Sequence, residues 1–430
     1  MTPISRTASR ASRIAAVGAA GLLALSLAAC SSDADSDQSS TSAKKVAPPP
    51  SGDPARVLTE KPAAKIEGKA ITLGVMSAQE GAYAESGKSA VEGAKFAAEQ
   101  INANGGVDGV PIKLVIEDTR GDVSTATNIV RKFATEENVL ATVGPLLSNE
   151  CEASCPVADS LGMPMLAPGV GKPGVVQAAG PHIFHLTAED CAHTQASLSA
   201  TIQASGLSTF AIIEDAKDAT STYMAETCYP EMMKKLGKEI ITTQTFTTGD
   251  QNLSAQVTNL KAKNPDAVFV ASGPADAARV AIEMDRQGFH PQILTSGGIQ
   301  SAGDDYIKAG GKAVEGTIMA AQFDPTTTEP GPGGLIKTYK EETGKTPSLN
   351  AAFAYDAVYI LVDIIKKDGV TNKESDLAPD RTKIMKGLAT QVQGWVGMGG
   401  DTTLKEDGDV IRVPQIATVT NGQMVITRPS

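Results

Sequence analysis

Two glycine-rich segments of this 430-residue chain have spacings that occur in phosphate-binding loops. In the first segment, Gly169, Gly171 and Gly174 match the G-x-G-x-x-G pattern that receives a dinucleotide at the start of a helix. Gly180-Pro181 ends any helical pattern soon after these glycines. We therefore interpret the first segment as a tight turn from a strand into a loop.

The second segment, Thr343-Gly344-Lys345-Thr346, is similar to the end of a P-loop. Tyr339 stands where a P-loop has its first glycine, and the preceding residues have a helical pattern. The sequence also lacks a nucleophile elbow, a zinc-protease motif and an EF-hand pattern. We therefore expect a protein that is not an enzyme and that needs neither a cofactor nor a metal.

Alternating strand and helix patterns fill most of the chain after residue 70. Residues 71–76 and 112–116 are short apolar runs typical of buried parallel strands, and alanines recur between them at helical spacing. The same alternation continues to residue 167 and restarts over residues 191–295, which predicts two doubly wound α/β lobes. Residues 413–420 and 424–427, separated by Asn421-Gly422, predict a terminal β-hairpin.

The first of these strand–helix–strand units carries a family resemblance. Its sequence, GVMSAQEGAYAESGKSAVEGAKFAAEQINANGGVDGVPIKLVIEDTRGD, closely resembles the opening of the type I periplasmic binding proteins of the branched-chain amino acid family. The helix end follows that family's G-A-K-x-A-x-E-x-I-N-A-x-G-G pattern, whereas Ala78 stands where proline is common. The resemblance runs from Lys69 to Val425.

This resemblance implies two Rossmann-like lobes with a ligand cleft between them. The chain would cross between the lobes near residues 187, 316 and 400. Residues 69–187 and 317–400 would then form the first lobe, and residues 188–316 and 401–430 the second. Several crossings make a hinge that can close on a ligand.

The loops at the carboxyl ends of the parallel strands define the predicted cleft. The residues expected to contact the ligand are Tyr83, Ser148, Asn149, Glu150, Gly169 and Gly171 in the first lobe, and Asp190, Thr220, Gly273 and Gly298 in the second. Ser148 precedes a predicted helix, where a hydroxyl and N–H groups suit a carboxylate, and the family's carboxylate-binding serine falls in this loop. A helix N-cap is an alternative role for Ser148 that does not exclude the first.

The acids of the predicted cleft differ from those of amino-acid-binding relatives. The acid that those relatives carry on a second-lobe loop is replaced here by Gly297-Gly298-Ile299, and Gly171 replaces a usual hydroxyl residue. Glu150, Asp190 and Asp218 are the candidates to replace the missing acid. The alternative for each is a solvated or helix-capping role. The resemblance implies branched-chain amino acids by default, and these missing contacts lead us to expect a small amino acid or related organic solute that is branched-chain amino acid-like, an amide or a carboxylate.

The N-terminus has the pattern of a lipoprotein signal. Residues 1–29 contain three arginines followed by an apolar run that is short for a membrane-spanning helix. Leu27-Ala28-Ala29-Cys30 resembles a lipobox, which implies lipid attachment at Cys30. An ordinary signal peptide cut before a chance cysteine is the alternative. Residues 30–68 are rich in Ser, Asp, Ala and Pro and predict a disordered tether.

Four cysteines follow Cys30, and an even number in an exported protein suggests two disulfides. We predict a Cys191–Cys228 bond, with Cys151 and Cys155 either bonded to each other or free. Structural zinc at Cys151-x-x-x-Cys155 is the rival interpretation, but the histidines lack a matching zinc spacing.

The formal net charge of −11 argues against a nucleic-acid partner. We predict a monomeric solute-binding lipoprotein, anchored on the extracytoplasmic face of the cell membrane. It would deliver a small molecule to the permease subunits of an ABC importer. A ligand-sensing surface receptor without a transport role, or a cell-envelope enzyme on the same fold, are the alternatives.

Overall fold

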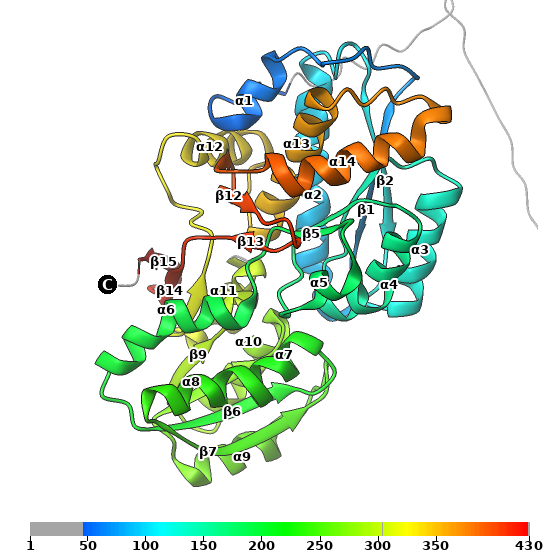
Figure 1. The fold of residues 1–430 in the computed structure, drawn as a ribbon. Coiled ribbons are helices and arrows are strands. Elements are labelled where there is room, and N and C mark those ends of the chain that lie inside the picture. The colour runs from blue at the N-terminus through cyan, green and yellow to red at the C-terminus, as the bar shows by residue number, and fades with distance from the viewer. Residues whose placement is uncertain (1–45, 303, 429–430) are drawn as a thin grey trace, which may run out of the picture. The chain divides into compact units, whose positions relative to one another are not determined.

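Two sheets, each covered by helices on both faces, make up most of the fold (Figure 1). The computed structural model describes residues 46–302 and 304–428, and Cys30 lies outside these residues. We call the first sheet and its helices lobe 1, and the second sheet and its helices lobe 2. None of the described helices combines the length and the apolar character needed to span a bilayer. The two lobes confirm the predicted fold class.

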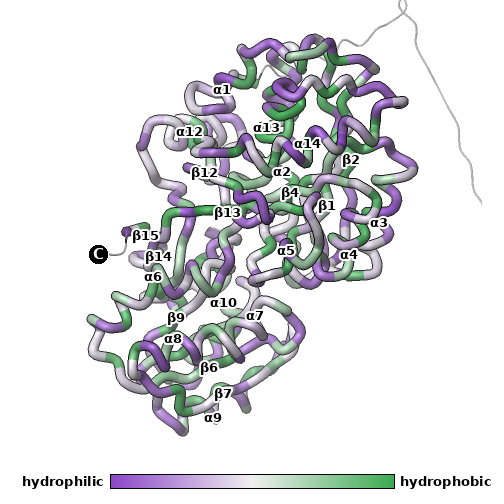
Figure 2. Tube along the Cα trace, in the orientation of Figure 1, coloured by the Kyte–Doolittle hydropathy of each residue, from purple (hydrophilic) through white to green (hydrophobic). Residues whose placement is uncertain are grey.

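Lobe 1 is built on a five-stranded sheet with the order β2-β1-β3-β4-β5, in which every neighbouring pair is parallel. The strands are β1 (Ile71–Ser77), β2 (Ile112–Asp118), β3 (Ala141–Val143), β4 (Met165–Ala167) and β5 (Ile183–His185). One face is covered by α2 (Ala84–Ala103) and α13 (Leu349–Lys367), the other by α3 (Val123–Thr135), α4 (Ser148–Ser160) and α5 (Val175–Ala179). Figure 2 shows the apolar character of α13, whose residues from Leu349 to Lys366 are all buried.

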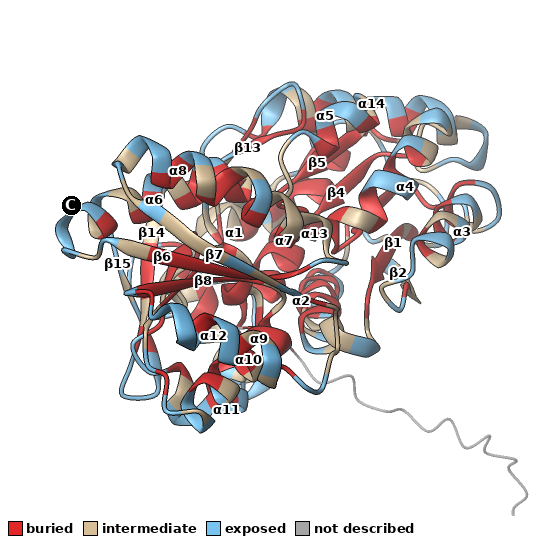
Figure 3. Ribbon diagram, turned by 90° about the horizontal axis from the view of Figure 1, so that it is seen from below, coloured by how far each residue is buried: buried red, intermediate tan, exposed pale blue. Residues whose placement is uncertain are grey.

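Lobe 2 is built on a seven-stranded sheet with the order β15-β14-β10-β9-β8-β6-β7. Its strands are β6 (Thr209–Asp215), β7 (Glu239–Phe246), β8 (Ala267–Ala271), β9 (Gln292–Thr295), β10 (Ile318–Ala321), β14 (Gln415–Thr420) and β15 (Gln423–Thr427). The strands from β6 to β10 run parallel, and β14 and β15 form the predicted antiparallel hairpin. Figure 3 shows buried strands such as β6 and β8 between helices whose outer faces are exposed.

The helices of lobe 2 also lie on both faces of its sheet. One face carries α6 (Asp190–Ala204), α7 (Ala219–Tyr223) and α8 (Tyr229–Leu236), with a π-helical turn at Met224–Cys228, and the other carries α9 (Ser254–Lys263), α10 (Pro274–Arg286) and α11 (Asp304–Gly310). Parallel strands with helices on both faces place the loops after the strands at one edge of each sheet. These loops form the site described below.

The chain passes between the lobes at residues 186–189, 322–331 and 412–414. Only the first passage lies at its predicted position. The boundary predicted at residue 316 precedes β10, which pairs with β9 and β14 and so belongs to lobe 2. The boundary predicted at residue 400 falls inside a small antiparallel sheet made of β11 (Trp395–Gly397), β12 (Gly400–Leu404) and β13 (Val410–Ile411). Leu404 and Val410 of this small sheet pack in the core of lobe 1.

Hydrogen bonds tie these three passages to one another. The backbone N–H of Ala188 donates to Gln322 Oε1 at 2.8 Å, which joins the first passage to the second. The Arg412 guanidinium donates to the carbonyl of Leu186 at 2.9 Å, which joins the third passage to the first. Gln300 accepts from the backbone N–H of Gln322 at 3.0 Å and so holds the second passage from lobe 2. The passages therefore form one connected hinge.

The predicted disorder of the tether is wrong for residues 46–68. This segment contains the helix α1 (Gly52–Thr59), and Val57 is fully buried in the core of lobe 1. Arg56 donates to both carboxylate oxygens of Asp363 in α13, at 3.1 and 2.8 Å, and Asp53 accepts from the backbone N–H of Val396 at 2.7 Å. The apolar residues of this segment lack a period, so sequence patterns miss a helix that only its contacts with lobe 1 stabilise.

We expect Val57→Ala to lower the free energy of unfolding by roughly 1–3 kcal/mol, because it removes buried methyl groups and leaves a cavity. Urea denaturation of the purified protein measures this loss. Thr59→Ala, at an exposed position of the same helix, is the matched control and should leave the midpoint nearly unchanged. Equal midpoints for Val57→Ala and the wild type would mean that α1 does not pack on lobe 1.

Candidate functional site

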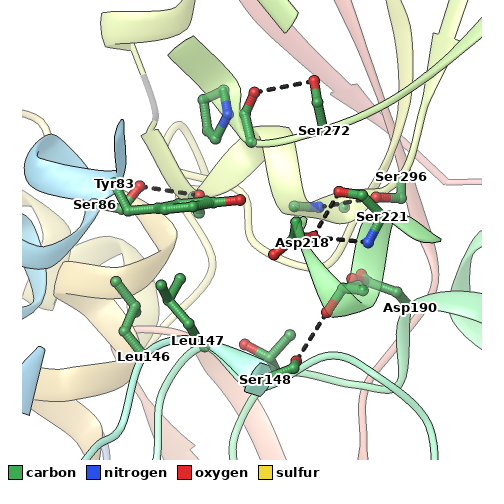
Figure 4. A pocket seen from close by; sticks show the side chains of 18 of the residues that line it. Tyr83, Ser86, Leu146, Leu147, Ser148, Asp190, Asp218, Ser221, Ser272 and Ser296 are labelled. Atoms are coloured by element: carbon green, nitrogen blue, oxygen red, sulfur yellow. Dashed lines mark hydrogen bonds between the residues drawn. The ribbon is translucent and has the colours of Figure 1, made fainter. Parts of the chain in front are cut away.

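A cleft lies between the two lobes, at the carboxyl edges of both sheets (Figure 4). The space inside it, counted out to the open solvent at its mouth, is about 720 Å³. The loops after β1, β3 and β4 contribute from lobe 1, and the loops after β6, β8 and β9 contribute from lobe 2. This is the edge at which the sequence predicted the cleft.

The structure places most of the predicted contact residues on the wall of this cleft. Those that line it are Tyr83, Ser148, Gly169, Asp190, Thr220, Gly273 and Gly298. Asp218, which the sequence suggested as a further acid, lines it too. The described residues of the wall include no histidine, cysteine, lysine or arginine.

Asn149, Glu150 and Gly171 do not line the cleft. Glu150 is fully buried and accepts a hydrogen bond from Thr119 Oγ1 and another from the backbone N–H of Leu147. Its burial raises the pKa of its carboxyl to about 7. Asn149 accepts from the backbone N–H of Glu150 at 2.9 Å. The reason for both departures is that α4 begins at Ser148, so its first turn takes up these side chains as capping groups.

Gly171 lies behind the wall, where its lack of a side chain makes room for Asp190. A Cβ atom built on Gly171 would lie only 2.6 Å from Asp190 Oδ2, and one built on Gly297 would lie 3.5 Å from Asp190 Oδ1. The backbone N–H of Asp190 donates to the carbonyl of Gly171 at 2.8 Å. The carboxylate of Asp190 therefore occupies space that two glycines leave free.

Asp190 is the most unusual charged group of the cleft. It is the first residue of α6 and is only 5% exposed, yet within the described chain its carboxylate accepts no hydrogen bond. Burial, and then the nearby charge of Asp218, raises the pKa of its carboxyl to about 7. A buried carboxylate without a partner costs free energy, which a bound cation would recover.

Asp218 lies on the cleft wall near Asp190, and Tyr83 lies across the cleft from Asp190, beside Ser86 (Figure 4). Asp218 caps α7 by accepting from the backbone N–H of Ser221 at 2.7 Å. Burial raises the pKa of Asp218, and burial together with the charges of Asp218 and Asp215 raises the pKa of Tyr83. A Cβ on Gly273 would lie 2.6 Å from the ring of Tyr83, so glycine at this position lets the ring of lobe 1 reach lobe 2.

Ser148 contacts the other lobe directly. Its hydroxyl oxygen accepts from the backbone N–H groups of Gly171 and Lys172, at 3.3 and 3.1 Å, and from the hydroxyl of Thr220 in lobe 2, at 2.8 Å. A hydroxyl also carries one hydrogen of its own, which these contacts leave available for donation into the cleft. The N-cap of α4 is Leu147, so the structure does not give Ser148 the alternative capping role.

The predicted contact residues leave out several polar residues of the cleft wall, among them Ser86, Ser301, Gln322 and Asn350. Ser86 Oγ and Ser301 Oγ lie 3.2 Å apart and join the two lobes. Asn350 stands in the first turn of α13, about 200 residues beyond the loops of the first sheet. Only the path of the chain through the hinge brings it to the cleft, so no local pattern marks it.

The cysteines form two disulfides, Cys151–Cys155 within α4 and Cys191–Cys228 between α6 and the π-helical turn. Both pairs were predicted, the first as one of two options. Cys191 directly follows Asp190, so the second bond fixes the start of α6 at the cleft. Over residues 46–302 and 304–428, no group of three or more His, Cys, Asp or Glu is placed to hold a metal ion.

Relatives of known type were found both by sequence and by structure. An amino acid binding protein of Pseudomonas aeruginosa is 25% identical over 255 residues, which is 59% of this chain and 68% of that protein. The Leu/Ile/Val-binding protein homolog 7 of Brucella melitensis is 23% identical over 315 residues, which is 69% of this chain and 77% of that protein.

Solved structures share the fold at lower identity. The leucine-binding protein LivK of Thermotoga maritima superposes with a TM-score of 0.73 at 24% identity, covering 84% of this chain and 99% of that one. LivJ of Streptococcus pneumoniae, in complex with isoleucine, superposes with a TM-score of 0.74 at 21% identity. The superposition covers 84% of this chain and 100% of that one. A solute-binding protein of Rhodopseudomonas palustris in complex with benzoate gives 0.74 at 16% identity, covering 84% and 96%.

A family model decides the assignment that the sequence suggested. Residues 70–423 match the model described as periplasmic binding protein, which is most of the chain. The two-lobed fold is shared with the LivK and LivJ binding proteins. The chain therefore belongs to the periplasmic binding protein family, as a solute-binding protein of type I.

Proposed function

We propose that this protein is an extracytoplasmic lipoprotein that binds an amino acid, or a closely related solute with a protonated amine, and delivers it to an ABC importer. The observation that carries the proposal is the carboxylate of Asp190, buried in the cleft without a hydrogen-bond partner among the described residues. A protonated amine is the ligand group that such a carboxylate attracts most strongly.

The charges of the cleft support a cationic end on the ligand. Asp190 and Asp218 line the same wall, and the described residues around them bring no positive side chain into the cleft. Burial first, and then the charge of Asp218, raises the pKa of the Asp190 carboxyl. A bound ammonium relieves both the repulsion and the desolvation of Asp190.

Ser148 supports a carboxylate on the same ligand. Its O–H hydrogen is used by none of the contacts to Gly171, Lys172 and Thr220, and α4 begins at this residue. A helix N-terminus favours negative charge. An ammonium at Asp190 and a carboxylate at Ser148 are the two ends of an α-amino acid, which agrees with the amino-acid-binding names of the relatives.

Contacts between the lobes support a ligand that is bound by closure of the hinge, as delivery to an importer requires. Thr220 of lobe 2 donates to Ser148 of lobe 1, and Ser86 of lobe 1 contacts Ser301 of lobe 2. These contacts exist only while the lobes are together. A ligand that touches both walls therefore selects the closed form, which a permease can distinguish from the open one.

We expect Ser148→Ala to weaken amino-acid binding by roughly 1–3 kcal/mol, because the ligand carboxylate loses a buried donor. Isothermal titration calorimetry on ligand-free protein measures the change. Ser160→Ala, at the exposed end of the same helix, is the matched control. An affinity that Ser148→Ala leaves unchanged would remove Ser148 from the site.

We expect Asp190→Asn to abolish binding of the amine while stabilising the empty protein at pH 8 by on the order of 1–3 kcal/mol. The folded pKa of Asp190, about 7, lies above its unfolded value, so its burial costs little near pH 4. The cost grows as pH rises from 4 to 7 and stays constant above that range. The stability gain of the variant should follow the same course in urea denaturation.

For the same reason, wild-type affinity should fall about tenfold or more between pH 8 and pH 5.5, as Asp190 takes up a proton. Asp304→Asn, which removes an exposed acid of lobe 2, is the control for the loss of one charge. A variant Asp190→Asn that binds amino acids as the wild type does would contradict the proposed role of this carboxylate.

We expect radiolabelled palmitate to be incorporated into the protein in cells, and Cys30→Ala to abolish this labelling. The thioether sulfur at Cys30 would carry the acyl chains, and more than one chain gives stable membrane anchoring. Labelling followed by membrane fractionation tests lipid attachment and localisation together. Palmitate that persists in Cys30→Ala would show that the lipid is attached elsewhere.

A further inference from the structure

The side-chain amide of Asn350 is buried in the cleft wall, and its oxygen accepts no hydrogen bond from the described residues. Asn350 is 1% exposed, and its Oδ1 has no hydrogen-bond partner among the described residues. The residue lines the same cleft as Asp190 and Ser148. Buried amides are almost always hydrogen-bonded, because leaving one unpaired loses the bonds it made to water.

Two hydroxyl groups line the same cleft near the start of α13, because Ser348, which precedes α13, hydrogen-bonds to Ser89 of α2. Ser86 belongs to α2 and Ser301 to the turn after β9, and their Oγ atoms lie 3.2 Å apart. Figure 4 shows Ser86 and Asp190 on opposite sides of the cleft, with Tyr83 beside Ser86. The cleft thus has an acidic end at Asp190 and a polar end without an ionised side chain at Ser86.

We propose that Asn350 and Ser86 form a subsite for an uncharged, hydrogen-bonding group at the far end of the ligand, and that the solute is therefore an amino acid with a carboxamide-like side chain. This inference rests on the proposed function, which supplies the amine at Asp190. It distinguishes the solute from branched-chain amino acids, which would cover the amide of Asn350 with methyl groups.

The charge of the distal group follows from the residues around it. Asp190 and Asp218 are the only carboxylates among the described residues of the wall, and no lysine, arginine or histidine lines it. An anionic distal group would therefore be buried without a counter-ion, which is costly. A carboxamide both donates and accepts, so it satisfies the amide of Asn350 and a serine hydroxyl without bringing in charge.

Isosteric ligand pairs test this subsite. L-Asparagine and L-leucine have side chains of nearly the same shape, and L-glutamine and L-methionine form a longer pair. We expect the amide member of at least one pair to bind ligand-free wild-type protein at least tenfold more tightly in calorimetry. A site built to bond a polar group rejects an analogue without that group strongly.

Two variants test whether Asn350 and Ser86 cause the preference for an amide side chain. Asn350→Leu should reduce the ratio of amide to apolar affinity at least tenfold, and Ser86→Ala should reduce it by a smaller factor. Thermal unfolding verifies that both variants are folded, and Ser160→Ala serves as the control. If Asn350→Leu is unfolded, Asn350→Ala takes its place and should lower the same ratio.

The outcomes separate this inference from the proposed function. Leucine or methionine binding as tightly as its amide counterpart, or a ratio that the Asn350 variant does not change, would overturn the distal subsite and leave amino-acid binding intact. Failure of the wild type to bind any of the four amino acids would overturn the amino-acid ligand, and the distal subsite with it.

Discussion

The burial of one carboxylate without a hydrogen-bond partner among the described residues is the constraint around which this structure is arranged. Asp190 begins α6 at the point where the chain first passes into lobe 2, and Gly171 and Gly297 leave the space that it occupies. The disulfide of the next residue, Cys191, holds that helix end in place. The empty protein carries the free-energy cost of this charge, and a bound cation removes it, so binding and stability are coupled through one side chain.

The hinge links binding at Asp190 to the relative position of the two lobes. The three passages between the lobes are bonded to one another through Gln322 and Arg412, so they bend as one unit. Arg412 also lies over the ring of Phe353 in α13, at 4.1 Å from its centroid, and donates to the carbonyl of Gly399. The hinge is thereby anchored in the core of lobe 1. A rigid lobe 1 with α1 packed on it leaves the angle between the lobes as the principal freedom of the fold.

The sequence predicted those parts of the structure that follow from local pattern and from the geometry of parallel sheets. Apolar runs located the strands, and the rule that loops after parallel strands meet at one edge located Ser148 and Asp190 on the cleft. The sequence-based prediction was wrong or incomplete where contacts between distant parts of the chain determine the structure. Glu150 turns inward because the first turn of α4 needs a cap, α1 is held only by its contacts with lobe 1, and Asn350 reaches the cleft through the hinge. The second and third passages lie later in the chain than predicted because β10 pairs within lobe 2 and β12 pairs within the small sheet. Hydropathy alone does not reveal these pairings.

Native mass spectrometry of the mature protein, purified without denaturation, tests the central claim most directly. A solute that stays bound through this purification is released in the spectrometer, and its accurate mass gives its elemental composition, including its nitrogen content. This account predicts a small molecule with a basic nitrogen, retained by the wild type. A nitrogen-free anion, such as an aromatic carboxylate, bound at full occupancy would contradict the account, because Asp190 would then face a like charge in a buried cleft.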